Sequence, residues 1–180
     1  MKNAILASLL LATTPAFAQA FELSSPDFAA GTAIPIEFAF DAFGCTGDNI
    51  SPALAWTNPP EGTQSFAVMV HDGDANTGGA GFWHWVVVDI PSETAGLAQG
   101  AGKDTDLPVG SREMTTDFGV PGWGGPCPPE ANEAHDYNFT LYALPVERLD
   151  IPDAATASFT GFVINQMALG SATFSASYDR

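Results

Sequence analysis

The sequence contains very few basic residues. Only 5 Lys and Arg stand against 21 Asp and Glu in 180 residues, which gives a formal net charge of -16 at pH 7. A surface of this sign repels nucleic acids and anionic membranes, and nucleic acid is excluded as a partner. It also provides no long-range attraction for anions. An anionic ligand would therefore need local hydrogen-bond donors.

The common signatures of catalysis and metal binding are also missing. The sequence has no Gly-x-Ser-x-Gly elbow, no His-Glu-x-x-His pair and no phosphate loop. The stretch 71–79 (HDGDANTGG) starts like a calcium loop, but its glycine falls one place late and the twelfth position is a tryptophan. A zinc site made of His71, His84 and His135 is an alternative, although their spacing carries no ligand signature. We expect neither a metal nor a cofactor.

A long apolar run that could span a bilayer is absent. Residues 1–20 (MKNAILASLLLATTPAFAQA) combine Lys2, a short apolar segment and small residues suited to cleavage. They predict an export signal peptide followed by a single domain over 21–180. We therefore expect a periplasmic or secreted protein without a membrane span.

Cysteine is scarce, with only Cys45 and Cys127. In an exported chain an even number of cysteines favours a disulfide, whereas a nucleophilic thiol would need a reducing compartment or a shielded site. We expect the bond between Cys45 and Cys127.

Glycine and proline, in contrast, are abundant, with 18 and 14 residues. They punctuate short apolar runs, a pattern typical of mainly β proteins. The loops between these runs are long, and long loops in a compact domain often carry function. Strands are expected over 34–40, 65–71, 82–90, 137–144 and 172–178.

One helix is expected near 156–169, with Ser158 or Thr160 as its cap and Gly170 at its end. It carries an apolar stripe at helical spacing, which we interpret as packing surface rather than a cofactor site. The stripe consists of Phe159, Phe162, Val163 and Met167.

A histidine interrupts the apolar strand 81–90 (GFWHWVVVDI). Strict alternation along a strand places His84 with Phe82 on one face and Trp85 on the other. A buried imidazole needs a hydrogen-bond partner, and Asp72 at a neighbouring strand end would serve. His84 is then either a core histidine or part of a ligand pocket.

The segment 124–137 (GGPCPPEANEAHDY) is stiffened by its prolines, and its glycines allow close approach of the backbone. Beside His135 and Tyr137 such a loop would form a preformed wall for a small ligand. A purely structural loop, pinned by Cys127, is the alternative.

Five motifs in this order resemble the phosphatidylethanolamine-binding proteins, and above all their bacterial Raf-kinase-inhibitor-like branch. The resemblance runs from about Phe21 to Tyr178. The motifs are CTGDNISPALAW (45–56), VMVHDGDA (68–75), FWHWVVVDIP (82–91), TDFGVPGWGGPCPP (116–129) and HDYNFTLYAL (135–144).

The resemblance implies a large antiparallel sheet packed on a smaller one, with few short helices. It also implies a small pocket for anions, including phosphorylated head groups. The chain departs from the family pattern where Gly73 and Asn76 replace prolines and Asp136 replaces an arginine. The ligand-binding positions that it implies are Asp72, His84, Cys127, Pro128, Pro129, His135 and Tyr137.

These observations favour an exported protein that binds a small anionic or phosphorylated ligand. The alternative is an inhibitor or modulator of an envelope protease or another protein partner. A hydrolase using Asp72, His84 and His135 as acid and base groups is a third hypothesis, but no nucleophile accompanies them. We expect a binding protein rather than an enzyme, and the sequence does not indicate an oligomeric state.

Overall fold

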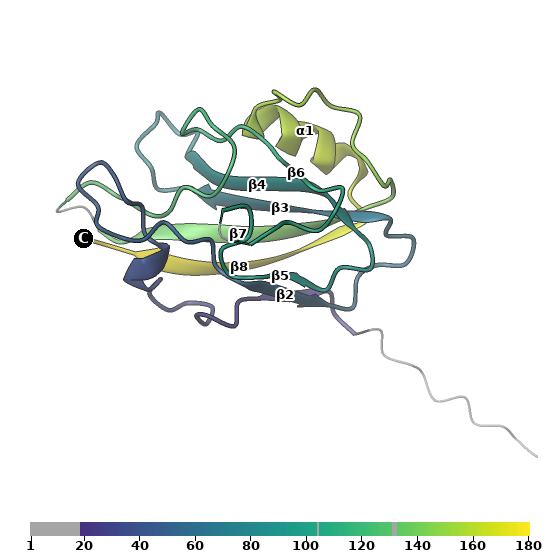
Figure 1. The fold of residues 1–180 in the computed structure, drawn as a ribbon, viewed down its shortest axis with the longest axis horizontal. Coiled ribbons are helices and arrows are strands. Elements are labelled where there is room, and N and C mark those ends of the chain that lie inside the picture. Colours follow the sequence, from purple (N-terminus) through teal and green to yellow (C-terminus); the bar gives the residue numbers. More distant parts are fainter. Residues whose placement is uncertain (1–18, 104, 131–132) are drawn as a thin grey trace, which may run out of the picture.

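Two antiparallel sheets form the body of the protein (Figure 1). The computed structural model describes residues 19–103, 105–130 and 133–180. The larger sheet has the strand order β6-β4-β3-β7-β8, and the smaller sheet has the order β1-β2-β5. The expected mainly β fold, a large antiparallel sheet packed on a smaller one, is confirmed. The strands are β1 (Glu22–Ser24), β2 (Leu54–Thr57), β3 (Ser65–Asp72), β4 (Phe82–Pro91), β5 (Gly96–Leu97), β6 (Arg112–Glu113), β7 (His135–Leu144) and β8 (Gly170–Tyr178).

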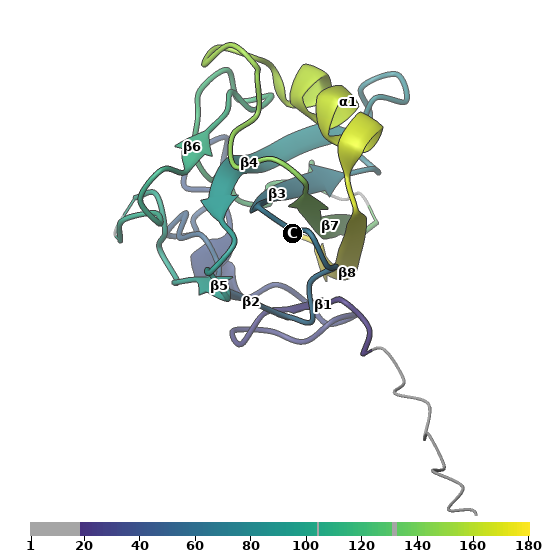
Figure 2. The ribbon, with the colours of Figure 1, turned by 90° about the vertical axis from the view of Figure 1, so that its right-hand side faces the viewer.

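The large sheet is the middle of three layers (Figure 2). The small sheet lies against one face, and the helix α1 (Ala157–Met167) covers part of the other. Trp56 of the small sheet and Phe139 of the large sheet belong to the core between the sheets. Met69 and Ile164 belong to a second core beneath α1. The large sheet is therefore buried from both sides at its centre.

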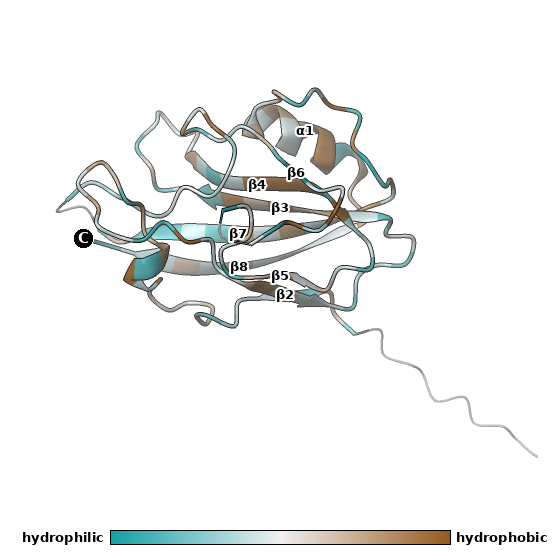
Figure 3. Cartoon of the chain, in the orientation of Figure 1, coloured by the Kyte–Doolittle hydropathy of each residue, from teal (hydrophilic) through white to brown (hydrophobic). Residues whose placement is uncertain are grey.

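Strands β3 and β4 lie at this centre and are almost continuously apolar (Figure 3). Because both of their faces pack against a core, no face needs polar residues. At the edge, β8 alternates between buried and more accessible positions, since only one of its faces is covered. This difference explains why the sequence indicated the extents of these strands well.

The expected strand over 34–40 is wrong. Ile36–Phe38 form a short 3-10 helix, η1, in which the Phe38 N–H donates to the Pro35 carbonyl. Beyond it, the Ala39 carbonyl accepts the N–H of Asn49, so the segment folds back on the following loop instead of joining a sheet. Four strands of two to four residues (β1, β2, β5 and β6) were not expected, because such short segments show no clear alternation.

The helix expected near 156–169 is confirmed as α1, but its ends differ. Thr156 is the N-cap, and its hydroxyl accepts the Phe159 N–H at 3.3 Å, so neither Ser158 nor Thr160 caps the helix. Gly170 does not end it either, because Gly170 is the first residue of β8.

The expected packing stripe of α1 is wrong for its two phenylalanines. Phe159 is 47% exposed and Phe162 is 62% exposed, although Val163 and Met167 are partly buried. The helix instead buries a face that includes the small Ala157 and Gly161. A Cβ added at Gly161 would lie 3.3 Å from the Met69 side chain, so small residues allow the helix to sit close to the sheet.

A disulfide joins Cys45 to Cys127, as expected. The two residues are 82 positions apart, and closing a loop of this length stabilises a fold by about 4–5 kcal/mol in the chain-entropy model. The bond ties the loop after η1 to the proline-rich loop before β7.

The predicted signal peptide, 1–20, lies almost entirely outside the described residues, so it stays a prediction. Within 19–103, 105–130 and 133–180, no helix has the length and apolar character needed to cross a membrane.

One buried ion pair fixes the loop that leads from β7 to α1. Asp89 of β4 is buried, and its Oδ2 accepts the Nε–H of Arg112 at 2.6 Å. The other oxygen of Asp89 accepts the N–H of Leu149 at 2.7 Å, and Arg112 donates to the Leu149 carbonyl at 3.0 Å. Asp89 therefore depends on Arg112 for its counter-charge.

Replacing Arg112 by Ala should lower the free energy of unfolding by about 3–5 kcal/mol, because it leaves a buried carboxylate without its partner. Arg148 is the matched control. It faces the same Asp89 at 4.0 Å, but its side chain is 61% exposed, against 14% for Arg112. Arg148→Ala should cost less than about 1 kcal/mol. Urea unfolding of the two variants measures both values, and equal losses would contradict this account.

Candidate ligand-binding site

A β-bulge in β4 decides which way His84 faces. Val70 of β3 lies opposite Trp85, but the next residue, His71, lies opposite Trp83, so His84 is the extra residue. Trp85 packs in the core between the sheets, whereas Trp83 packs against the core beneath α1. The His84 ring lies 5.0 Å from that of Tyr137, which belongs to the core between the sheets. His84 and Trp85 thus share a face, so the predicted opposite placement of Trp85 is wrong, whereas His84 does lie with Phe82, whose ring is 5.3 Å away.

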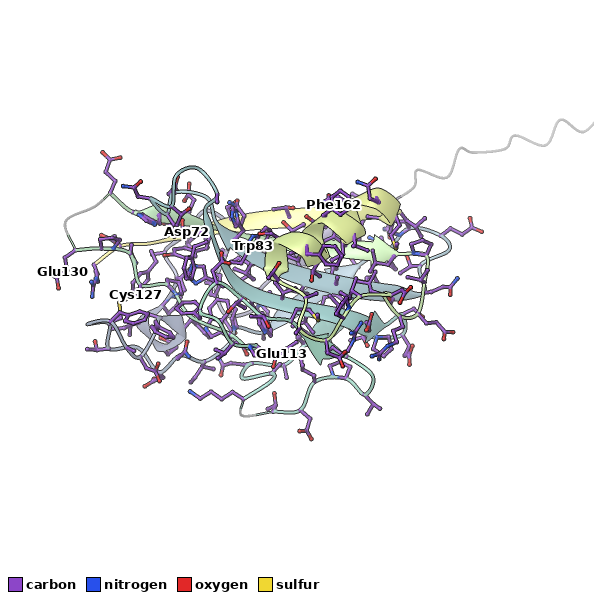
Figure 4. All side chains as sticks on the ribbon, turned by 90° about the horizontal axis from the view of Figure 1, so that it is seen from above. Asp72, Trp83, Glu113, Cys127, Glu130 and Phe162 are labelled. Atoms are coloured by element: carbon purple, nitrogen blue, oxygen red, sulfur yellow. A yellow bond between two sulfur atoms is a disulfide. The ribbon has the colours of Figure 1, made fainter. Side chains whose placement is uncertain are left out.

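All seven predicted ligand-binding residues line one cavity of about 270 Å³. The cavity lies where β3 ends and where β4 and β7 begin, and Figure 4 shows Asp72 and Cys127 toward the same end of the molecule, away from Phe162. The seven residues are Asp72, His84, Cys127, Pro128, Pro129, His135 and Tyr137. The sequence missed five further lining residues, namely Phe43, Ala75, Asn76, Phe82 and Phe118.

Asp72 holds two parts of this cavity together. Its Oδ1 accepts the N–H groups of Asp74 and Ala75 at 2.9 and 3.0 Å, which fixes the turn after β3. Its Oδ2 accepts the Nδ1–H of His135 at 2.8 Å. Asp72 is therefore the partner of His135 and not, as expected, of His84.

His84 has a different partner, the Gly124 carbonyl, at 2.6 Å from its Nδ1. A carbonyl oxygen only accepts, so the ring proton sits on Nδ1 and Nε2 of the neutral ring is an acceptor. Burial lowers the pKa of His84 from 6.5 to about 4. The imidazole is consequently neutral at pH 7.

Tyr137 places a buried hydroxyl group at the cavity. Its side chain is fully buried, and its Oη meets no full hydrogen-bond geometry with a described residue, although the Asp72 carboxylate and the Cys127 backbone lie close to it. Burial, and after it the negative charge of Asp72, raise the pKa of Tyr137 above its usual range. The hydroxyl keeps its proton at neutral pH and is a donor that a ligand could satisfy.

Aromatic rings form much of the remaining wall. The ring of Phe118 lies 4.9 Å from that of Phe82 and 5.5 Å from that of His84. Phe43 at the rim is 76% exposed and has a left-handed backbone, with φ of 57°. Left-handed backbone is uncommon for a bulky residue and often accompanies function. These apolar surroundings are the cause of the low pKa of His84.

The proline-rich wall is fixed from several directions. Besides the disulfide at Cys127, Arg180 donates from Nε to the Pro128 carbonyl at 2.7 Å. The Gly125 N–H donates to Asn49 at 2.8 Å. Neither Arg180 nor Asn49 was predicted to support this loop, because both lie far from it in the chain. The expectation of a preformed wall fits this arrangement.

The third histidine lies outside the cavity. His71 approaches the Ala80 carbonyl through Nε2 at 3.0 Å, and its ring packs 4.2 Å from that of Trp83. The three histidines do not converge as the zinc alternative required. Among the residues that the structure describes, no group of three or more His, Cys, Asp or Glu is arranged to hold a metal ion.

Comparison with known proteins places this sequence and this fold in one family. The family model described as phosphatidylethanolamine-binding protein matches residues 24–179. The chain belongs to the phosphatidylethanolamine-binding protein family. The resemblance drawn from the five motifs is confirmed.

Bacterial members of the family are similar over most of the chain. UPF0098 protein YbcL of Escherichia coli is 38% identical over 182 residues, 99% of each chain. UPF0098 protein YbhB of the same organism is 42% identical over 158 residues, 87% of this chain and 99% of the relative. Putative lipoprotein LppC of Mycobacterium tuberculosis is 37% identical over 171 residues, 93% of this chain and 77% of the relative.

A solved structure agrees with these sequence comparisons. The crystal structure of Escherichia coli YbcL, described as a member of the mammalian family, superposes with a TM-score of 0.85. That comparison covers 89% of this chain and 98% of YbcL at 38% identity. The family assignment thus rests on sequence and on fold.

The pKa of His84 predicts how this family member responds to acid. Because folding lowers that pKa from 6.5 to about 4, the neutral ring stabilises the fold above pH 6.5, and this contribution is lost as the pH falls toward 4. The titration of His84 alone should lower the free energy of unfolding by about 2 kcal/mol when the pH falls from 7 to 4.5.

Urea unfolding of the wild type and of His84→Phe at these two pH values measures the difference. The wild type should lose about 2 kcal/mol more than His84→Phe. The control is His71→Gln, which changes a histidine outside the cavity and should keep the full loss. An equal loss in the wild type and in His84→Phe would show that His84 titrates normally.

Proposed function

We propose that this protein is an exported small-ligand-binding protein whose cavity takes a small anionic or phosphorylated group. The observation that carries the proposal is the unpartnered hydroxyl of Tyr137, which lies in one cavity with His84 and the Asp72–His135 pair. A buried hydroxyl without a partner costs stability, so its retention favours a ligand that completes it. Members of this family bind ligands, which supports a binding role.

The cavity suggests how such a group would be held. It contains about 270 Å³, enough for a small head group but not for a large molecule. None of the described Lys or Arg residues lines it, so recognition would rest on neutral donors such as the Tyr137 hydroxyl. The carboxylate of Asp72 opposes a bound anion. We therefore expect weak affinity at neutral pH.

Three observations favour export to the cell envelope. The disulfide between Cys45 and Cys127 suits an oxidising compartment. Residues 1–20 have the pattern of a signal peptide. The relative LppC is named a putative lipoprotein, and an envelope location for that protein agrees with these two features.

Replacing Tyr137 by Phe tests the proposal with little structural change. The variant keeps the ring and removes only the unpartnered hydroxyl, so its melting temperature without ligand should equal or exceed that of the wild type. Its affinity for a phosphorylated ligand should fall by about ten- to a hundredfold, since a hydrogen bond to a charged group contributes about 1.5–3 kcal/mol.

A melting-temperature screen with phosphate and with phosphoethanolamine supplies the measurement. Thr140→Val is a suitable control, because Thr140 is on the same strand but hydrogen-bonds to Thr173 outside the cavity. If neither compound raises the melting temperature of the wild type at any concentration, the proposed ligand class is wrong.

The alternative, an inhibitor or modulator of an envelope protein such as a protease, has one observation in its favour. Phe159 and Phe162 are exposed large apolar side chains on the outer face of α1. Exposed apolar patches often mark protein contacts. Capture from an envelope extract should then succeed with the wild type and fail with a Phe159→Ser, Phe162→Ser double variant. Capture that is unchanged in this variant but lost in Tyr137→Phe would assign the contact to the cavity.

A further inference from the structure

We propose that the cavity selects a phosphate group that still carries a proton, namely a phosphomonoester in its monoanionic form, over anions that carry none. This inference rests on the proposed function and adds the chemical form of the ligand. It follows from which atoms of the cavity donate and which accept.

The donor nitrogen of His84 is already used inside the protein. Its Nδ1–H points to the Gly124 carbonyl at 2.6 Å, so Nε2 is the polar atom that the ring has left for a ligand. The side-chain hydrogen bond of His84 within the described residues runs through Nδ1 and not through Nε2, although the Gly125 backbone also lies near the ring. As an acceptor, Nε2 requires a donor from the ligand, and a P–OH group supplies one.

The groups around His84 do not remove the need for a hydrogen-bond donor from the ligand. The charged and titratable groups near His84 are Asp72 and His71 on β3, and His135 and Tyr137 on β7. The Asp72 carboxylate accepts hydrogen bonds, and the Nδ1–H of His135 points to Asp72. Burial of His84 among aromatic rings keeps its ring neutral well below pH 7. An anion without a proton would therefore set its lone pairs against those of Nε2.

The other side of the ligand would be served by Tyr137. Its hydroxyl is buried and forms no well-aligned hydrogen bond among the described residues, although Asp72 and the Cys127 backbone lie near it, so it can turn to donate to an unprotonated phosphate oxygen. A monoanionic phosphomonoester offers both an O–H donor and acceptor oxygens. A site that hydrogen-bonds a particular O–H strongly rejects analogues that lack it.

Three small anions distinguish selection for a P–OH proton from a simple effect of ligand charge. At pH 5 methyl phosphate, dimethyl phosphate and methyl sulfate each carry about one negative charge, because the second pKa of a phosphomonoester is about 6. Only methyl phosphate has an acidic O–H group. At pH 8 it loses that proton, whereas the other two are unchanged.

The experiment is a calorimetric titration of the protein with the three anions at pH 5 and pH 8. Methyl phosphate should bind at least about tenfold more tightly than either control at pH 5. Its affinity should fall by at least about tenfold at pH 8. Any change in the protein between these pH values acts on all three anions, so the two controls correct for it.

The variant His84→Phe keeps a ring in the cavity and removes the acceptor, so methyl phosphate should lose its advantage at pH 5. His71→Gln should retain it. A ¹⁵N spectrum of the wild-type histidines should show His84 protonated at Nδ1 only, which tests the tautomer even if His84→Phe fails to fold.

Two results would overturn the inference. If methyl sulfate binds as tightly as methyl phosphate at pH 5, the cavity does not select for a proton, although the proposed anion binding stands. If none of the three anions binds, the proposed function itself fails for this ligand class and the inference fails with it.

Discussion

One extra residue in β4 is the constraint on which the site depends. The bulge at His84 lets Trp85 stay in the core between the sheets while the imidazole turns to the same side of the sheet. Without it, one of these two side chains would be on the α1 side, where Trp83 and Val86 already pack. The sheet thus keeps a continuous core and places a polar ring at its end. β-Bulges next to binding sites commonly serve this purpose.

The polar groups of the cavity are oriented mainly by the protein itself. Gly124 fixes the tautomer of His84, and Asp72 fixes the ring of His135. Both contacts use an Nδ1–H. The Tyr137 hydroxyl, in contrast, is buried without a well-aligned partner among the described residues. A site of this kind is neutral at His84 and enclosed by aromatic rings. Its fixed donors and acceptors require a ligand with a matching hydrogen-bond pattern. If the site binds anions as proposed, it differs from anion sites built on Lys or Arg, which attract charge without regard to protonation.

Sequence reasoning succeeded where the pattern is local. The long apolar runs of β3 and β4 indicate strands because both of their faces are covered, and the family motifs indicate the cavity residues. It failed where the outcome depends on tertiary contacts. A single extra residue at His84 leaves no mark in the sequence, so strict alternation misplaced Trp85 relative to it. The exposed face of α1 was misjudged because the sheet accepts small residues such as Gly161 more closely than large ones.

The disulfide at the cavity wall determines when, after synthesis, the cavity is complete. Cys127 lines the cavity, and its bond to Cys45 forms only after oxidation. A newly made chain in a reducing cytoplasm therefore lacks the covalent link that holds this wall. For a chain that crosses the membrane before it oxidises, the complete cavity first exists on the far side. If the protein is exported and binds a ligand as proposed, it meets that ligand there, and it would suit collecting a compound outside the cytoplasm rather than carrying one out.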